Sequence, residues 1–147
     1  MVRPRRRARD IRWKARPLMT KNAKDAEAIT PLTAPVFYIL LALADRERHG
    51  YAIIKEVETL TERKVRLSTG TLYAAIRRLL DGGLIEETEE RPHPALDDER
   101  RRYYRLTPFG EEVARAEVDR MIHLTGVALD KKLVSTAPVG QGSEECR

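Results

Sequence analysis

The chain has 147 residues, a formal net charge of +5 and a pI of about 9.6. This length suits one domain with a single hydrophobic core, and the basic balance favours an anionic partner. One cysteine excludes an internal disulfide, and the three histidines show no metal-ligand spacing. The sequence also has no phosphate-binding glycine loop and no Ser-His-Asp pattern, so we expect no enzyme activity, no metal and no cofactor.

The basic residues are concentrated at the N-terminus. Residues 1–17 carry eight arginines and lysines against one aspartate, a net charge of +7, which leaves the remainder of the chain at −2. Residues 1–28 show no apolar periodicity and are predicted to be a disordered extension. Met19 is an alternative start that would remove the arginine-rich segment, and the sequence leaves both starts open.

An apolar run follows this segment, from Ala34 to Ala44, in an order that resembles a secretory signal. Signal peptides are about 15 to 30 residues long overall, whereas this run begins later than that. Asp25 and Glu27 also lie in the region that would have to be basic. The run is shorter than the about 20 residues that span a bilayer. We therefore expect a cytoplasmic protein with no membrane segment.

Two helices are predicted first, over residues 33–44 and 51–61, with a short charged turn between them. Thr33 can cap the first helix, and Pro35 is tolerated in its first turn. The second helix has an apolar face with charged residues off it, and this face consists of Ile53, Ile54, Val57 and Leu60.

The third predicted helix lies in LSTGTLYAAIRRLLDGGLI, residues 67–85. Ser68 is a suitable N-cap, and the glycine pair at 82–83 can end the helix. A stripe with helical spacing is predicted to be buried and consists of Leu72, Ile76, Leu79 and Leu80. The outer row is polar and basic, with Thr69, Tyr73 and Arg77 four residues apart and Thr71, Ala74 and Arg78 beside them.

A β-hairpin and a long helix are predicted next. Residues 84–90 and 101–107 alternate or nearly alternate between apolar and polar, as hairpin strands do. Thr107 and Pro108 then open a helix that extends to about Leu133. Its exposed apolar side is expected to pack on a second copy through Val118, Met121, Ile122, Thr125, Leu129 and Leu133. Residues 134–147 are low in apolar content and are predicted to be a disordered tail.

Three helices followed by a two-stranded hairpin are the order of a winged helix-turn-helix. In that fold the third helix enters the major groove of DNA and the hairpin loop reaches the adjacent backbone or minor groove. We therefore predict a mainly α fold with a small β-hairpin. Residues 29–107 would form the winged helix-turn-helix DNA-binding domain, followed by a C-terminal dimerisation helix at 108–133. The expected partner is double-stranded DNA.

Tyr73 is the first candidate for DNA contact, because an exposed phenol can bond a phosphate or lie against a base; the alternative is that it packs under the wing. Arg77 and Arg78 can bind phosphate or guanine, or can pair with a neighbouring acid. Two further groups are predicted to favour phosphate: Ser68, Thr69 and Thr71 at the helix start, and Arg101 and Arg102 at the base of the wing. A capping role alone explains Ser68 equally well.

Three blocks of the sequence together resemble the PadR family of winged-helix transcriptional regulators. They are HGYAIIKEVE at 49–58, LSTGTLYAAIRRLLDGGLIEE at 67–87, and RRYYRLTPFG at 101–110. The likeness spans about residues 32–133, and the final region is similar to the subgroup with a single C-terminal helix. The resemblance implies a homodimer on a pseudo-palindromic operator, usually acting as a repressor, with the final helix making the dimer.

The resemblance also bears on individual residues. It places Lys55 toward the DNA backbone and includes Tyr73 in its GTLY block, whereas Tyr51 suits core packing or a backbone contact better than base readout. Relatives bind small hydrophobic effectors between subunits, and this chain has Phe37, Val118, Met121 and Ile122 for such a pocket, although core and dimer packing is the expected use. A winged-helix protein-interaction module with a basic tail that binds nucleic acid non-specifically remains the alternative.

Overall fold

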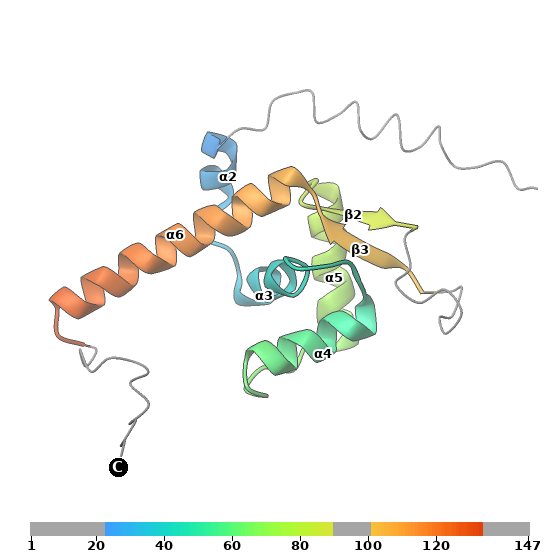
Figure 1. The fold of residues 1–147 in the computed structure, drawn as a ribbon, viewed down its shortest axis with the longest axis horizontal. Coiled ribbons are helices and arrows are strands. Elements are labelled where there is room, and N and C mark those ends of the chain that lie inside the picture. Colours follow the sequence, from blue (N-terminus) through green and yellow to red (C-terminus); the bar gives the residue numbers. More distant parts are fainter. Residues whose placement is uncertain (1–22, 90–100, 134–147) are drawn as a thin grey trace, which may run out of the picture.

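The computed structural model describes residues 23–89 and 101–133. Helices α3, α4 and α5 gather around a core, a small sheet lies beside α5, and α6 extends beyond all of them (Figure 1). The elements are α2 (Ala23–Ile29), α3 (Ala34–Ala42), β1 (Arg48–His49), α4 (Gly50–Leu60), α5 (Thr69–Asp81), β2 (Ile85–Thr88), β3 (Tyr103–Leu106) and α6 (Pro108–Asp130). The predicted mainly helical fold with a small β-region and a long C-terminal helix is confirmed.

The core forms where α3, α4 and α5 meet the sheet and the first turns of α6. Ile39 and Leu40 of α3 and Ile53 of α4 are fully buried. The predicted stripe of α5 is also confirmed, because Leu72, Ile76 and Leu79 are buried and Leu80 packs partly buried against the same cluster. Burying one face of α5 in this way leaves its opposite face to solvent.

Both ends of α5 follow from local side-chain and backbone chemistry. Ser68 caps the helix, since its Oγ accepts a hydrogen bond from the Thr71 N–H at 3.1 Å. At the other end, Gly83 has a φ of 73°, a conformation that glycine adopts without strain. The Leu84 N–H can then donate to the Leu79 carbonyl at 2.9 Å. This reversal leads the chain directly into β2.

The predicted two-stranded hairpin is a three-stranded antiparallel sheet with the order β1-β3-β2. Strand β1 lies in the segment that was expected to be a charged turn. Its Arg48 is buried, donates from Nε to the Ala42 carbonyl at 2.6 Å, and pairs with Asp45 at 3.1 Å and Glu56 at 3.4 Å. The buried cation is therefore neutralised, and a charged segment can join the sheet. The loop between the other two strands lies outside the described residues.

Residues 23–29 form helix α2, although the sequence predicted a disordered extension through residue 28. Helix α2 packs against α6, and Ala26 is 1% exposed there. So short a helix gives no periodic signal and depends on tertiary packing for its stability. The arginine-rich residues before it and the predicted tail at 134–147 lie outside the described part of the chain.

Helix α6 begins inside the core. Thr107 caps it, because its Oγ1 accepts from the Gly110 N–H at 3.0 Å and donates to the Gly83 carbonyl at 2.6 Å. Val113, one turn later, is fully buried. Beyond residue 117 the helix leaves the core and its side chains become exposed. Within residues 23–89 and 101–133, no helix has the length and apolar character to cross a membrane.

Glu117 is a buried carboxylate at the point where α6 leaves the core. It is 0% exposed and receives hydrogen bonds from Arg120 at 2.6 and 3.0 Å and from the Leu32 N–H at 3.3 Å. The Arg120 hydrogen bonds hold the pKa of Glu117 below its usual value, although burial opposes this effect. The carboxylate thus ties the segment before α3 to the long helix.

The stability of the protein is expected to depend on Glu117 in a pH-dependent way. Because the folded-state pKa is lowered, the ionised group stabilises the fold fully above its unfolded pKa of about 4.3. That contribution is lost as the pH falls through the folded-state pKa. Glu117→Gln should therefore cost about 1 to 3 kcal/mol at pH 7 and progressively less below pH ~4. Urea unfolding across this pH range measures the difference.

The control for this prediction is Asp119→Asn, which removes an exposed carboxylate from the same helix. It should leave the free energy of unfolding within about 0.5 kcal/mol of wild type at each pH. A Glu117→Gln penalty that stayed constant from pH 7 to pH 3 would contradict the assigned role of the ionised carboxylate.

Candidate nucleic-acid interface

The outer row of α5 is exposed, as predicted. Tyr73 is 49% exposed, and Thr69 and Arg77 lie on the same row one turn before and after it. Thr71 and Arg78 are exposed beside them. The helix therefore presents hydroxyls, a phenol and two guanidinium groups to solvent, which are donors suited to DNA phosphates and base edges.

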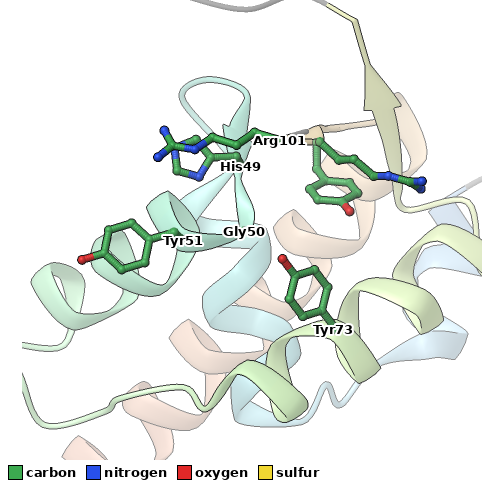
Figure 2. Close-up of a pocket in the computed structure, with 7 residues that line it drawn as sticks. His49, Gly50, Tyr51, Tyr73 and Arg101 are labelled. Atoms are coloured by element: carbon green, nitrogen blue, oxygen red, sulfur yellow. The ribbon is translucent and has the colours of Figure 1, made fainter. Parts of the chain in front are cut away.

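A hollow of about 340 Å³ lies beside this row, where the start of α4, the side of α5 and the first residues of β3 meet. Figure 2 shows His49 and Arg101 side by side above Gly50, with Tyr73 rising from α5 toward the same point. The lining residues are His49, Gly50, Tyr51, Tyr73, Arg101, Arg102 and Tyr104. Three stretches of chain that are far apart in the sequence thus line one hollow.

Gly50 leaves room at the hollow for the ends of two α5 side chains. A Cβ atom at this position would lie 2.9 Å from the Tyr73 hydroxyl oxygen and 3.3 Å from a Leu72 methyl carbon. A side chain at this position would displace the Tyr73 hydroxyl from its place beside Gly50. The alternative that Tyr73 packs entirely beneath the wing does not fit its half-exposed position.

The arginines at the base of the wing differ in their surroundings. Arg102 pairs with Glu87 of β2, with 3.6 Å between the Arg102 Nη1 and the Glu87 Oε2. Arg101 instead lies against His49, with its Nη1 3.4 Å from the His49 Nε2. The charge of Arg102 is therefore partly offset by a neighbouring strand, and the guanidinium of Arg101 is directed toward the start of α4.

Tyr104 forms the floor of the hollow from β3. It is 4% exposed, and burial raises the pKa of its phenol, with a further increase from the negative charge of Glu87. The phenol therefore remains uncharged at neutral pH. Tyr104 also belongs to the hydrophobic core, and Leu106 of the same strand packs partly buried against it.

Two α4 residues that were considered for DNA contact, Tyr51 and Lys55, lie on the outer surface of the molecule. Tyr51 is 62% exposed, so core packing is not its role. The Lys55 ammonium is 5.4 Å from the centre of the Tyr51 ring and 3.6 Å from a Glu58 carboxylate oxygen. The two side chains form an exposed aromatic and cationic pair next to the hollow.

His49 is the residue of this surface that the sequence interpretation did not include. It caps α4, since its Nδ1 accepts from the Ala52 N–H at 3.3 Å. It also lies in β1, the strand that the sequence did not predict. Its position in the HGY block was the one signal in the sequence. The contact between this ring and Arg101 depends on the pairing of β1 with β3, and the spacing of residues in the sequence does not indicate that pairing.

The exposed half of α6 carries large apolar side chains. Ile122 is 64% exposed and Leu133 is 76% exposed. Every residue predicted for dimerisation is exposed to solvent, and Leu124, which was not predicted, is 49% exposed. Phe37, one of the residues considered for an effector pocket, is buried. In residues 23–89 and 101–133, no cluster of histidine, cysteine, aspartate and glutamate could hold a metal.

The fold has three core helices, α3, α4 and α5, followed by an antiparallel wing, and the third of these helices, α5, has a polar outer face. This arrangement defines a winged-helix DNA-binding protein. Residues 39–116, more than half of the chain, match the model of the transcriptional regulator PadR-like family. The chain therefore belongs to the PadR-like family, which is a family of transcriptional regulators and not of enzymes.

Individual relatives agree with this assignment. A transcriptional regulator of Mycobacterium tuberculosis is 35% identical over 100 residues, which cover 60% of this chain and 87% of that protein. A PadR family transcription regulator from Clostridium difficile R20291 has a similar structure, with a TM-score of 0.58 and 25% identity over 69% of this chain and all of that chain.

One relative is much longer than this chain. It is an uncharacterised 37.1 kDa protein of a Streptomyces fradiae transposon, 38% identical over 88 residues, or 60% of this chain. The match spans 23% of that protein's length.

Proposed function

We propose that this regulator is a cytoplasmic homodimeric repressor that binds a pseudo-palindromic operator sequence-specifically. The observation that carries the proposal is the polar and basic outer row of α5, Thr69, Tyr73 and Arg77, next to the wing. A helix used to dock a protein would instead expose apolar side chains there. In this proposal α5 enters the major groove, and the wing contacts the adjacent backbone or minor groove.

The proposed DNA contacts divide into two groups. Tyr73, Arg77 and Arg78 face the bases and flanking phosphates from the middle of α5. The remaining contacts are to the backbone, from Ser68, Thr69 and Thr71 at the start of α5, Tyr51 and Lys55 on α4, and Arg101 and Arg102 at the wing.

We also propose that the exposed stripe of α6 forms the dimer. Val118, Met121, Ile122, Thr125, Leu129 and Leu133 are all exposed on one copy and would be covered by a second copy. The winged-helix units of the two copies, residues 29–107 in each, would thus be joined by the dimerisation helices at residues 108–133. A small hydrophobic effector, if the regulator has one, would bind between the subunits near Val118, Met121 and Ile122.

The decisive experiment compares binding to DNA from upstream of the protein's own gene with binding to random duplex DNA. The wild-type protein is expected to prefer the upstream DNA by about a hundredfold or more. Tyr73→Ala/Arg77→Ala should remove most of this preference, because a good side-chain contact to a base discriminates by about 1 to 3 kcal/mol. Arg115→Ala, which removes an exposed cation on α6, is the matched control and should bind as wild type does.

A protein-interaction module with an adhesive basic tail would give a different result. Its DNA binding would be weak, equal for both DNAs, unaffected by the α5 substitutions and lost when residues 1–18 are deleted. For a dimer that neutralises about four phosphates per subunit, the log-log salt dependence should have a slope of about −7. If that slope vanished with the tail, the winged helix would have no role in DNA binding and the proposal would fail.

A further inference from the structure

Glu58, near the end of α4, lies between two cations. Its Oε1 is 3.1 Å from the Nε of Arg66, which belongs to the connection between α4 and α5, residues 61–68. Its Oε2 is 3.6 Å from the Nζ of Lys55, about one turn earlier on α4. The contact with Arg66 is an ion pair and does not have hydrogen-bond geometry. One carboxylate thus bridges α4 and the segment that leads into α5.

The carboxylate of Glu58 is less exposed than the two cations that it bridges. The Glu58 side chain is 19% exposed, whereas the Lys55 and Arg66 side chains are 49% and 80% exposed. A carboxylate near the protein interior attracts nearby cations more strongly than one in bulk water, because the effective dielectric constant is lower. Two cations against one carboxylate also leave the group with a net positive charge. An approaching polyanion would therefore meet the cations first.

The backbone on both sides of Arg66 is anchored. The Val65 N–H donates to the Thr61 Oγ1 at 3.1 Å, and Leu67 is buried in the core. Ser68, the N-cap of α5, follows directly. Arg66 therefore stands on a fixed segment immediately before the start of α5, where the proposed function already places backbone contacts.

We propose that Arg66 is a further contact to the DNA backbone, and that Glu58 is a positioning residue that holds Arg66 and Lys55 in place for two phosphates. The inference rests on the proposed function and makes it more specific. A guanidinium has five N–H donors and an ammonium has three, so each cation can contact Glu58 and a phosphate together. Holding two long side chains in place beforehand reduces the conformational entropy that DNA binding would otherwise cost.

The sign of the change in affinity separates positioning from simple charge repulsion. If charge alone mattered, removing a carboxylate from a DNA-binding surface should strengthen binding. Glu58→Gln is instead expected to weaken binding to duplex DNA from upstream of the protein's own gene by about threefold to tenfold, because both cations would have to be ordered on binding. Glu62→Gln is the matched control. Glu62 is 85% exposed in the same connection, and its replacement should leave binding unchanged or slightly stronger.

Arg66→Gln tests the additional contact directly. Affinity for the same upstream DNA should fall about tenfold, and the log-log salt slope should become shallower by about 0.9 per subunit, because one phosphate contact is lost. Glu58→Gln keeps both cations and should not make the slope shallower. Arg115→Gln, which removes an exposed cation on α6, is the charge control and should keep the wild-type affinity and slope.

A third variant separates positioning from a purely structural role of Glu58. In Lys55→Gln/Arg66→Gln the carboxylate has no cation left to hold, so adding Glu58→Gln should no longer weaken binding. A structural role would weaken binding in that background as well and would overturn the positioning role. Urea unfolding of each variant gives the folded fraction, and affinities are compared at equal concentrations of folded protein.

Two further results would overturn this inference while the proposed function stood. They are tighter binding by Glu58→Gln, as expected for Glu62→Gln, and wild-type affinity and salt slope in Arg66→Gln. Absence of any preference for the upstream DNA over random duplex DNA in the wild-type protein would instead refute the proposed function.

Discussion

Gly110→Ala is expected to lower the free energy of unfolding by about 3 kcal/mol or more, a large part of the stability of a small domain. A Cβ atom at Gly110 would overlap the backbone carbonyl of Leu84. That carbonyl cannot move aside easily, because it accepts from the Thr107 N–H at 3.0 Å and from the Thr107 Oγ1 at 3.1 Å. Thermal and urea unfolding of the full chain, followed by circular dichroism, measure the loss.

Gly70→Ala is the matched control, since both glycines lie in the first turn of a helix and no atom lies within 4 Å of a Cβ at Gly70. Alanine should be neutral or stabilising there, by up to about 1 kcal/mol. Equal unfolding midpoints for Gly110→Ala and wild type would show that the contact between the start of α6 and the end of α5 is not tight.

Ile122→Asp/Leu129→Asp is expected to convert the proposed dimer into a folded monomer. Both side chains are exposed on α6 away from the core, so their replacement should leave the winged-helix core intact. Charges at the centre of the apolar stripe would have to be desolvated to form the interface. Light scattering measures the mass, and operator affinity should fall by a factor of about 10² to 10⁴, because the second half-site is no longer bound by a tethered partner.

The control for the dimer prediction is Arg115→Glu, which changes charge on the same helix next to α2 and outside the apolar stripe. It should remain dimeric and bind the operator as wild type does. A double aspartate variant that stayed dimeric at micromolar concentration would place the interface elsewhere and would remove α6 from this role.

The features that the sequence predicted correctly are those encoded by neighbouring residues. Ser68 marks the start of α5 and Gly83 marks its end, both through contacts within a few residues. Thr107 followed by Pro108 starts α6 in the same way. The stripe on α5 was recognisable because its helical period matches the side that is buried. Such signals need no knowledge of the rest of the fold.

The features that were missed depend on distant partners. Strand β1 forms because Arg48 and His49 pair with Tyr104 and Tyr103 of β3, which lie far along the chain, and a charged hexapeptide gives no sign of this pairing. Glu117 interrupts the apolar pattern of α6 but is buried, and it accepts a hydrogen bond from the Leu32 N–H, which lies 85 residues earlier in the chain. Leu60 shows the reverse case, since it shares the periodicity of Ile53 but is 47% exposed at the end of α4, where the core no longer reaches.

The candidate site was partly predictable for the same reason. The outer row of α5 follows directly from its buried stripe, and the arginines at the wing base follow from the hairpin. The hollow does not, because it requires α4, α5 and β3 to meet at His49. Its geometry is a property of tertiary packing and not of any single segment.

The hydrogen bonds of Thr107 to Gly83 and Leu84 join the end of α5 to the start of α6 through two adjacent backbone carbonyls. Helices α5 and α6 are therefore connected directly at this point. In a dimer, the crossing angle between the two copies of α6 would set how far apart the two copies of α5 stand. Since successive major grooves on one face of DNA are about 34 to 36 Å apart, a small rotation at the dimer interface would move both helices out of register with the operator.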